Sequence, residues 1–103
     1  NRLTAGLLTQ LINGAVKDPR LRPLVSYLPV AGGDGKLYER YGDSAAKGYV
    51  RAKTGTLTGV SALAGTAQGN SGRVYAFAFL VNDGDILAAR KAQDALASAL
   101  HEF

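Results

Sequence analysis

Hydrophobic residues near the start of the chain recur at helical spacing. Apolar side chains three and four residues apart predict an amphipathic helix, and they are Leu3, Leu7, Leu8, Leu11, Ile12 and Val16. Thr4 is placed to cap this helix at its N-terminus, and Asp18-Pro19 predicts its end. A second, short helix is expected over residues 21–27, because Pro29 follows and cannot continue it.

The second half of the chain changes to the alternating pattern of strands. We expect strands at residues 49–56, 60–68 and 73–82, with the turn residues Gly69-Asn-Ser-Gly72 between the last two. Links this short imply antiparallel neighbours.

The third strand is apolar on both faces, so both faces should be covered. Its aromatic face consists of Tyr75, Phe77, Phe79 and Val81. Its alanine face consists of Val74, Ala76, Ala78 and Leu80. The small alanines leave room for a closely packed helix, and we expect the last helix of the chain there.

That last helix should begin after Asp85, which can cap it. Apolar residues three and four apart predict its buried stripe, namely Ile86, Ala89, Ala92, Leu96, Ala99, Leu100 and Phe103. Arg90 and the other charged residues lie off this stripe. The turn Asn82-Asp-Gly-Asp85 resembles the start of a calcium loop, but apolar residues follow where further ligands should be, so no metal site is predicted. The predicted fold is α+β, with three antiparallel strands, the C-terminal helix on one face and the N-terminal helices on the other.

Composition limits the classes of function. The chain has 103 residues, at most one modest domain, and it has no cysteine for disulfides, thiolate catalysis or Cys-based metal sites. The net charge of +4 permits an anionic partner. The basic residues are scattered along the chain, which favours a solvated surface over a nucleic-acid interface.

The stretch from Val50 to Val60 carries the candidate chemistry. Lys53-Thr54-Gly55-Thr56 places an ammonium group, a glycine and two hydroxyls in direct succession on a predicted strand. Lys-Thr-Gly is one of three signature motifs of penicillin-binding proteins and β-lactamases. With its flanks, Arg51-Ala-Lys-Thr-Gly-Thr-Leu-Thr-Gly-Val-Ser-Ala-Leu-Ala-Gly65 resembles the low-molecular-mass penicillin-binding proteins of the D-alanyl-D-alanine carboxypeptidase/endopeptidase family. Leu28-Pro-Val-Ala-Gly-Gly-Asp-Gly-Lys-Leu37 and Asn1-Arg-Leu-Thr resemble the same family.

The resemblance implies that residues 1–103 are the C-terminal portion of one transpeptidase-type domain of the penicillin-binding-protein/β-lactamase kind. The absence of an initiator Met at Asn1 fits this expectation. The upstream chain would carry the missing Ser-x-x-K and Ser-x-Asn motifs. Peptidoglycan stem peptides and β-lactams are then the expected partners, an exocytoplasmic location is expected, and no cofactor is needed. Membrane association is not predicted either way.

The resemblance also implies the roles of the motif residues. Lys53 is expected to be catalytic, as a fixed cation beside the nucleophile, and the Thr56 N–H is expected to be an oxyanion donor. The hydroxyls of Thr54 and Thr56 would hold the terminal carboxylate of the substrate. Gly55 would keep the wall of the groove free of a Cβ, so that substrate can lie against the strand.

The nucleophile is not predicted within this chain. Ser44-Ala-Ala-Lys47 reads as Ser-x-x-K, but it lies too close to Lys53 in sequence for the chain to fold back over the strand. His101 is interpreted as a surface residue rather than a base, since no serine–carboxylate set accompanies it. The isolated chain is therefore expected to be inert.

Two other functions stay open at this point. One is a β-lactamase or esterase on the same fold. The other is a non-catalytic basic domain that binds an anionic polymer, which the net charge and the missing nucleophile favour.

The motif strand carries one geometric expectation. Backbone groups alternate between the two edges of an antiparallel strand. Lys53 and Gly55 should bond to the strand that begins near Val60, while the N–H and C=O of Thr56 should point to an edge without a strand partner.

Overall fold

The computed structural model describes residues 3–33 and 46–103. The elements follow the order α1 (Ala5–Lys17), α2 (Arg22–Ser26), β1 (Val50–Leu57), β2 (Val60–Gln68), β3 (Val74–Asn82) and α3 (Ile86–His101). Each predicted helix and strand occurs, with ends that differ from the expected ones by a residue or so. Ser44 and residues 34–37 of the glycine-containing stretch 28–37 lie outside the described residues.

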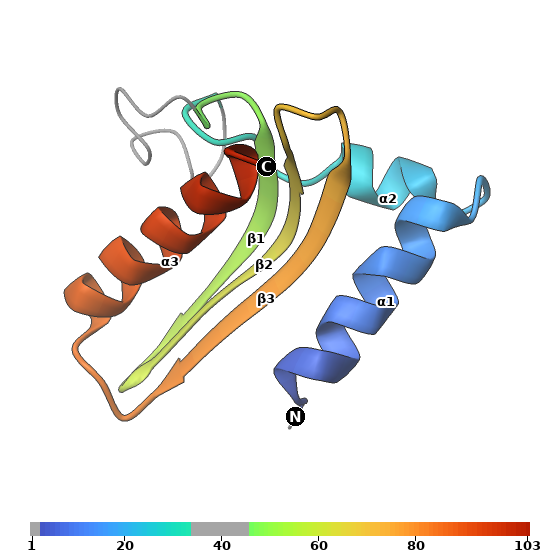
Figure 1. The fold of residues 1–103 in the computed structure, drawn as a ribbon. Coiled ribbons are helices and arrows are strands. Elements are labelled where there is room, and N and C mark those ends of the chain that lie inside the picture. Colours follow the sequence, from blue (N-terminus) through green and yellow to red (C-terminus); the bar gives the residue numbers. More distant parts are fainter. Residues whose placement is uncertain (1–2, 34–45) are drawn as a thin grey trace.

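The strands form an antiparallel three-stranded sheet in the order β1-β2-β3. α3 covers one face of this sheet, and α1 with α2 lies on the other (Figure 1). Leu57 faces Val60, so Thr58 and Gly59 form the turn between β1 and β2. Gly59 has a φ of +71°, a conformation that glycine adopts without strain. The α+β prediction is confirmed.

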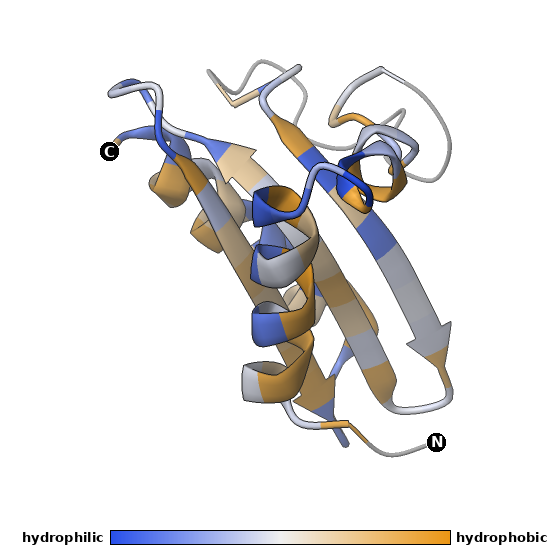
Figure 2. Cartoon of the chain, turned by 90° about the vertical axis from the view of Figure 1, so that its right-hand side faces the viewer, coloured by the Kyte–Doolittle hydropathy of each residue, from blue (hydrophilic) through white to orange (hydrophobic). Residues whose placement is uncertain are grey.

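The two faces of β3 are covered in the opposite way to the expected one. The aromatic face lies against α3, where Phe77 joins a core cluster with Leu63 of β2 and Ala97 of α3. The alanine face lies against α1, which stands in front of the sheet in Figure 2. The prediction considered residue size on the sheet alone, whereas close packing depends on both partners. Aromatic rings fit against the alanines of α3, and alanines fit against the larger side chains of α1.

The buried stripe of α3 is also rotated from the expected one. Its buried residues are Ala89, Gln93, Ala97 and His101, whereas Leu96 is 51% exposed. Gln93 accepts a hydrogen bond from the Ser61 hydroxyl and donates one to the Phe79 carbonyl, both at 3.2 Å. A polar side chain with such partners can be buried at little cost, and hydrophobic periodicity does not reveal it.

His101 is not the surface residue that the sequence suggested. It is 7% exposed, its Nδ1 contacts the Gln68 carbonyl, and its ring stacks on Tyr49 with 4.4 Å between centroids. His101 therefore packs the C-terminal end of α3 against the end of the sheet.

Both predicted helix caps are present. Thr4 Oγ1 accepts a hydrogen bond from the Leu7 N–H, and Asp85 accepts one from the Leu87 N–H, each at 3.0 Å. The Asp83 N–H donates to the Gly59 carbonyl, so the aspartate-containing turn is tied to the β1–β2 hairpin. In the part of the chain that the structure describes, no helix has the length and apolar character needed to cross a bilayer.

Candidate active-site strand

β1 has two halves with different surroundings. Residues 50–52, here called the covered half, include Val50 and Ala52, both fully buried. The segment at residues 29–31 runs along their outer edge: the Ala31 N–H donates to the Val50 carbonyl at 2.8 Å, and the Ala52 N–H donates to the Pro29 carbonyl at 2.9 Å. Residues 53–57, the open half, are mostly exposed. Within residues 3–33 and 46–103, no strand pairs with the outer edge of the open half.

These bonds determine where the motif's backbone groups point. Val50 and Ala52 bond to the outer edge, whereas the Tyr49 carbonyl accepts from Gln68, at the end of β2. By alternation, Lys53 and Gly55 bond to β2, where they face Ala64 and Ala62.

The N–H and C=O of Thr56 therefore point to the outer edge, as those of Thr54 do. This confirms the predicted orientation of the strand. A group placed along the open half can accept a hydrogen bond from the Thr56 N–H without disturbing the sheet.

Side chains of the motif lie on both faces. Lys53 shares its face with α1, is exposed, and donates from Nζ to the carbonyl of Thr54. That carbonyl lies at the open edge, so the ammonium group is held beside the edge. Thr54 and Thr56 lie on the face of α3.

Arg90 of α3 contacts the motif, although the sequence pattern did not predict this contact. Its guanidinium donates to Thr56 Oγ1 at 3.2 Å. The contact fixes the position of the hydroxyl oxygen and leaves the hydroxyl proton free to be donated to a third group. Arg90 directly follows Ala89, a buried residue of α3. Its position next to the buried stripe is the feature of the sequence that could have indicated a contact with the sheet.

The fold requires a glycine at position 65 of the sheet but not at position 55. A Cβ on Gly55 would meet only the Cβ of Ala62 at 3.6 Å, an ordinary contact. A Cβ on Gly65 of β2 would lie 1.9 Å from the Arg51 carbonyl oxygen. Gly65 is therefore needed by the fold, whereas the fold itself does not need a glycine at position 55.

The other candidate groups are not brought to Lys53. His101 lies by Tyr49 and Gln68, at the end of the sheet next to the covered half. Lys47 is exposed, and its aliphatic chain lies over Gly32. The described residues contain no group of three or more His, Asp or Glu side chains that could hold a metal ion.

Comparison with known proteins connects this geometry to a family. Residues 1–103 match the D-Ala-D-Ala carboxypeptidase 3 (S13) family over their whole length. The chain belongs to this family. It is 50% identical to carboxypeptidase DacB of Mycolicibacterium smegmatis over 106 residues, which cover 97% of this chain and 23% of that protein. It is 38% identical to the D-alanyl-D-alanine carboxypeptidase of an Actinomadura species, covering 100% of this chain and 20% of that protein.

Solved structures agree with the sequence comparison. Penicillin binding protein 4 from Haemophilus influenzae superimposes with a TM-score of 0.82 at 25% identity, covering 98% of this chain and 25% of that one. The same protein has been solved in complex with a β-lactam. The S13 chain described here thus spans about a quarter of the length of these relatives.

Proposed function

We propose that this chain supplies one wall of the active site of a serine-type D-Ala-D-Ala carboxypeptidase that acts on peptidoglycan. The observation that carries the proposal is the open half of β1. In a chain of the S13 family, Lys53, Thr54 and Thr56 line a strand edge that no described strand covers. An extended substrate can add alongside such an edge by strand addition.

Each group then has a distinct chemical task. A serine hydroxyl from the upstream chain attacks the carbonyl carbon of the D-Ala-D-Ala bond, and Lys53 stabilises the developing negative charge and assists proton transfer. The Thr56 N–H donates to the oxyanion. The amine of the terminal D-alanine leaves with a proton, and water hydrolyses the acyl-enzyme to restore the serine.

The hydroxyls of Thr54 and Thr56 hold the substrate's terminal carboxylate. Arg90 acts through Thr56 as a positioning residue, because its guanidinium occupies the hydroxyl oxygen and directs the hydroxyl proton away. Gly55 leaves the strand without a Cβ where substrate backbone lies.

The rest of the domain would cover the exposed apolar side of α1. Leu7 and Leu11 lie four residues apart in α1 and are 43% and 59% exposed, and Leu3, which precedes the helix, is 52% exposed. Residues at this spacing share one face of a helix. The chain also covers only 23% of its mycobacterial relative. We infer that residues 1–103 form the C-terminal portion of one domain, and that the upstream part, with its Ser-x-x-K and Ser-x-Asn motifs, packs on this leucine row.

The inhibitor class follows from the same geometry. A β-lactam carries a carboxylate and a strained amide in the arrangement of the D-Ala-D-Ala end, so the open half should bind it as it binds substrate. The penicillin-binding relative solved with a β-lactam supports this extension. An exocytoplasmic site of action follows from a peptidoglycan substrate. The comparisons do not favour the two alternatives, a β-lactamase or esterase and a basic polymer-binding domain.

Labelled penicillin and a D-Ala-D-Ala peptide test the proposal. The intact protein should be acylated on an upstream serine and should release D-alanine from the peptide. The isolated 103-residue chain should show neither reaction, because it lacks a credible nucleophile. A covalent adduct on Ser44, found by mass spectrometry, would contradict this assignment.

A further inference from the structure

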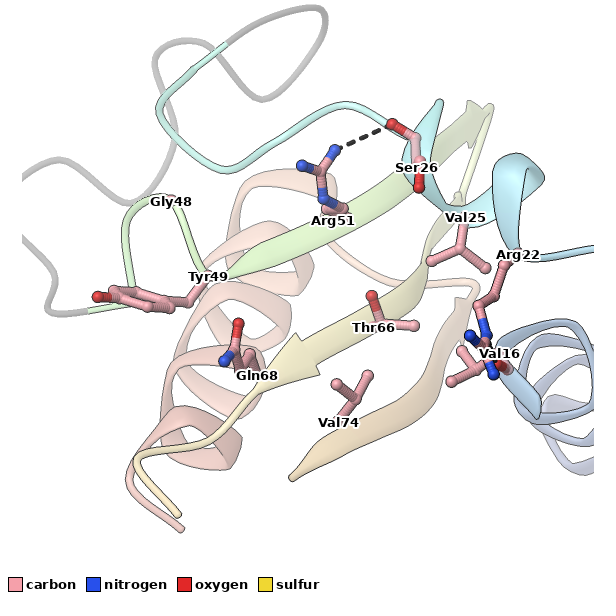
Figure 3. A pocket seen from close by; sticks show the side chains of 10 residues that line it. All are labelled: Val16, Arg22, Val25, Ser26, Gly48, Tyr49, Arg51, Thr66, Gln68 and Val74. Atoms are coloured by element: carbon pink, nitrogen blue, oxygen red, sulfur yellow. Dashed lines mark hydrogen bonds between the residues drawn. The ribbon is translucent and has the colours of Figure 1, made fainter. Parts of the chain in front are cut away.

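A pocket of about 270 Å³ lies on the α1 side of the sheet, next to the covered half of β1. It is formed where the end of α1 and α2 meet the three strands (Figure 3). Its lining residues include Val16, Arg22, Val25, Arg51, Thr66 and Val74. None of them belongs to the open half.

Two guanidinium groups are fixed at this pocket. Arg51 Nη1 donates to the Ser26 carbonyl at 3.0 Å, and Arg22 Nε donates to the Val16 carbonyl at 2.9 Å. Each of these bonds uses one of the five N–H donors of a guanidinium. Among the described residues that line the pocket there is no Asp or Glu. Asp18 lies outside the pocket, is paired with Arg20, and acts on Arg22 only as a more distant negative charge, so both guanidinium groups can still bind an anion.

A buried hydroxyl gives a second, independent indication of a ligand. Thr66 is 5% exposed and faces Arg51 across the β1–β2 pair, so their side chains are neighbours on one face. Its side chain points into the pocket (Figure 3). Its hydroxyl has no hydrogen bond to any other residue that the structure describes. Leaving a buried hydroxyl unpaired is costly, and a ligand oxygen in the pocket would remove that cost.

Val16, Val25 and Val74 line one side of the pocket, and Tyr49 and Gln68 lie at its other end. We propose that the pocket binds a small aliphatic carboxylate, with its oxygens on Arg22, Arg51 and Thr66 and its alkyl part against the valines. Guanidinium groups match the planar carboxylate well. The volume corresponds to roughly nine water molecules at ~30 Å³ each, enough for an acid of about four to six carbons. This site is separate from the Lys53 strand and does not rest on the proposed function.

Isobutyrate is a suitable probe, and methyl-detected NMR of the intact protein is a suitable readout. Isobutyrate should cause saturable shifts confined to the methyl groups of Thr66, Val16, Val25 and Val74. Isobutyramide, the uncharged analogue, should cause none. Inorganic phosphate should compete only weakly, because the valines offer it no hydrogen bonds.

Substitutions separate recognition from a structural effect. Arg51→Gln and Arg22→Gln should each raise the isobutyrate Kd about tenfold or more, since each removes a charge-assisted hydrogen bond. The matched control is Lys91→Gln, because Lys91 is an exposed residue of α3, on the opposite face of the sheet, and its loss should leave the Kd unchanged. Thr66→Val, nearly the same size, should raise the Kd without lowering the thermal unfolding midpoint.

Arg51→Gln removes a hydrogen bond to α2 and could disturb that helix. Arg22 is exposed, so Arg22→Gln should leave the fold intact and still tests the loss of a positive charge from the pocket. Equal binding of isobutyrate and isobutyramide, stronger binding of phosphate, or an unchanged Kd in Arg22→Gln would overturn the proposal. Acylation by labelled penicillin should stay normal in all these variants, so failure of this pocket is distinguishable from failure of the active-site assignment.

Discussion

The covered and open halves of β1 belong to one continuous strand, yet they face different surroundings. The covered half has core residues on one side and backbone partners along both edges. The open half has its polar residues exposed and its outer edge unpaired within the described chain. In Figure 2 most of the open half is pale or blue, whereas β3 is mainly orange.

This difference shows how an exposed strand edge can be held in place. An unpaired strand edge alone would be mobile and prone to aggregation. Here the strand is held at its upstream end by the 29–31 segment and along its inner edge by β2. The groups that we propose to face substrate are thereby preorganised, which is the condition for strong electrostatic stabilisation of a transition state.

The largest expected effect is on the rate of acylation, and it should distinguish Lys53 from Lys47, which lie on either side of the covered half in the sequence. Lys53→Ala in the intact protein should slow acylation by penicillin by an amount equivalent to about 2.7–4 kcal/mol, the typical cost of removing one preorganised group. Lys47→Ala is the control and should change stability by no more than about 0.5 kcal/mol, as a surface substitution. Equal effects on acylation would mean that the motif is misassigned.

Alanine substitutions at Gly65 and Gly55 should have different effects: the first should lower stability, and the second should slow acylation at unchanged stability. Gly65→Ala forces a Cβ into the backbone of the covered half and should cost about 3 kcal/mol, at the upper end of overpacking effects. Gly55→Ala should leave the thermal unfolding midpoint nearly unchanged, because its Cβ meets only Ala62 at an ordinary distance. It should nevertheless slow acylation, since the new methyl group lies where substrate approaches. A Gly55→Ala protein that is unstable would show that this glycine serves the fold.

The smallest of these effects concerns Arg90. Arg90→Gln should weaken reaction with substrates that carry a terminal carboxylate by about tenfold, or about 1.4 kcal/mol, through loss of its hydrogen bond to Thr56 Oγ1. Substrates without that carboxylate should be affected less. Lys91→Gln, on the neighbouring exposed position, is the control. In a Thr56→Val background the effect of Arg90→Gln should disappear, and if it persists Arg90 does not act through Thr56.

Sequence patterns predicted the helices, strands, caps and strand orientation because these depend on periodicity and local backbone rules. They did not predict the face of α3, since Gln93 and His101 are buried through hydrogen bonds to distant residues. The pairing of the covered half with Pro29 and Ala31 was not predicted, because it joins segments that are distant in the sequence. The contact of Arg90 with Thr56 depends on the crossing of α3 over the sheet, which no local pattern encodes.

The most direct test of the account removes the Thr56 N–H from the open edge. Proline is tolerated where an N–H faces away from the sheet, and it breaks the ladder where the N–H is paired. Thr56→Pro should therefore fold, whereas Gly55→Pro should not. Relative to Thr56→Val, which removes the hydroxyl alone, Thr56→Pro should slow acylation a further ~10²–10³-fold, the usual effect of losing one oxyanion donor. A folded Thr56→Pro protein that is acylated as fast as Thr56→Val would contradict the oxyanion role of the open half.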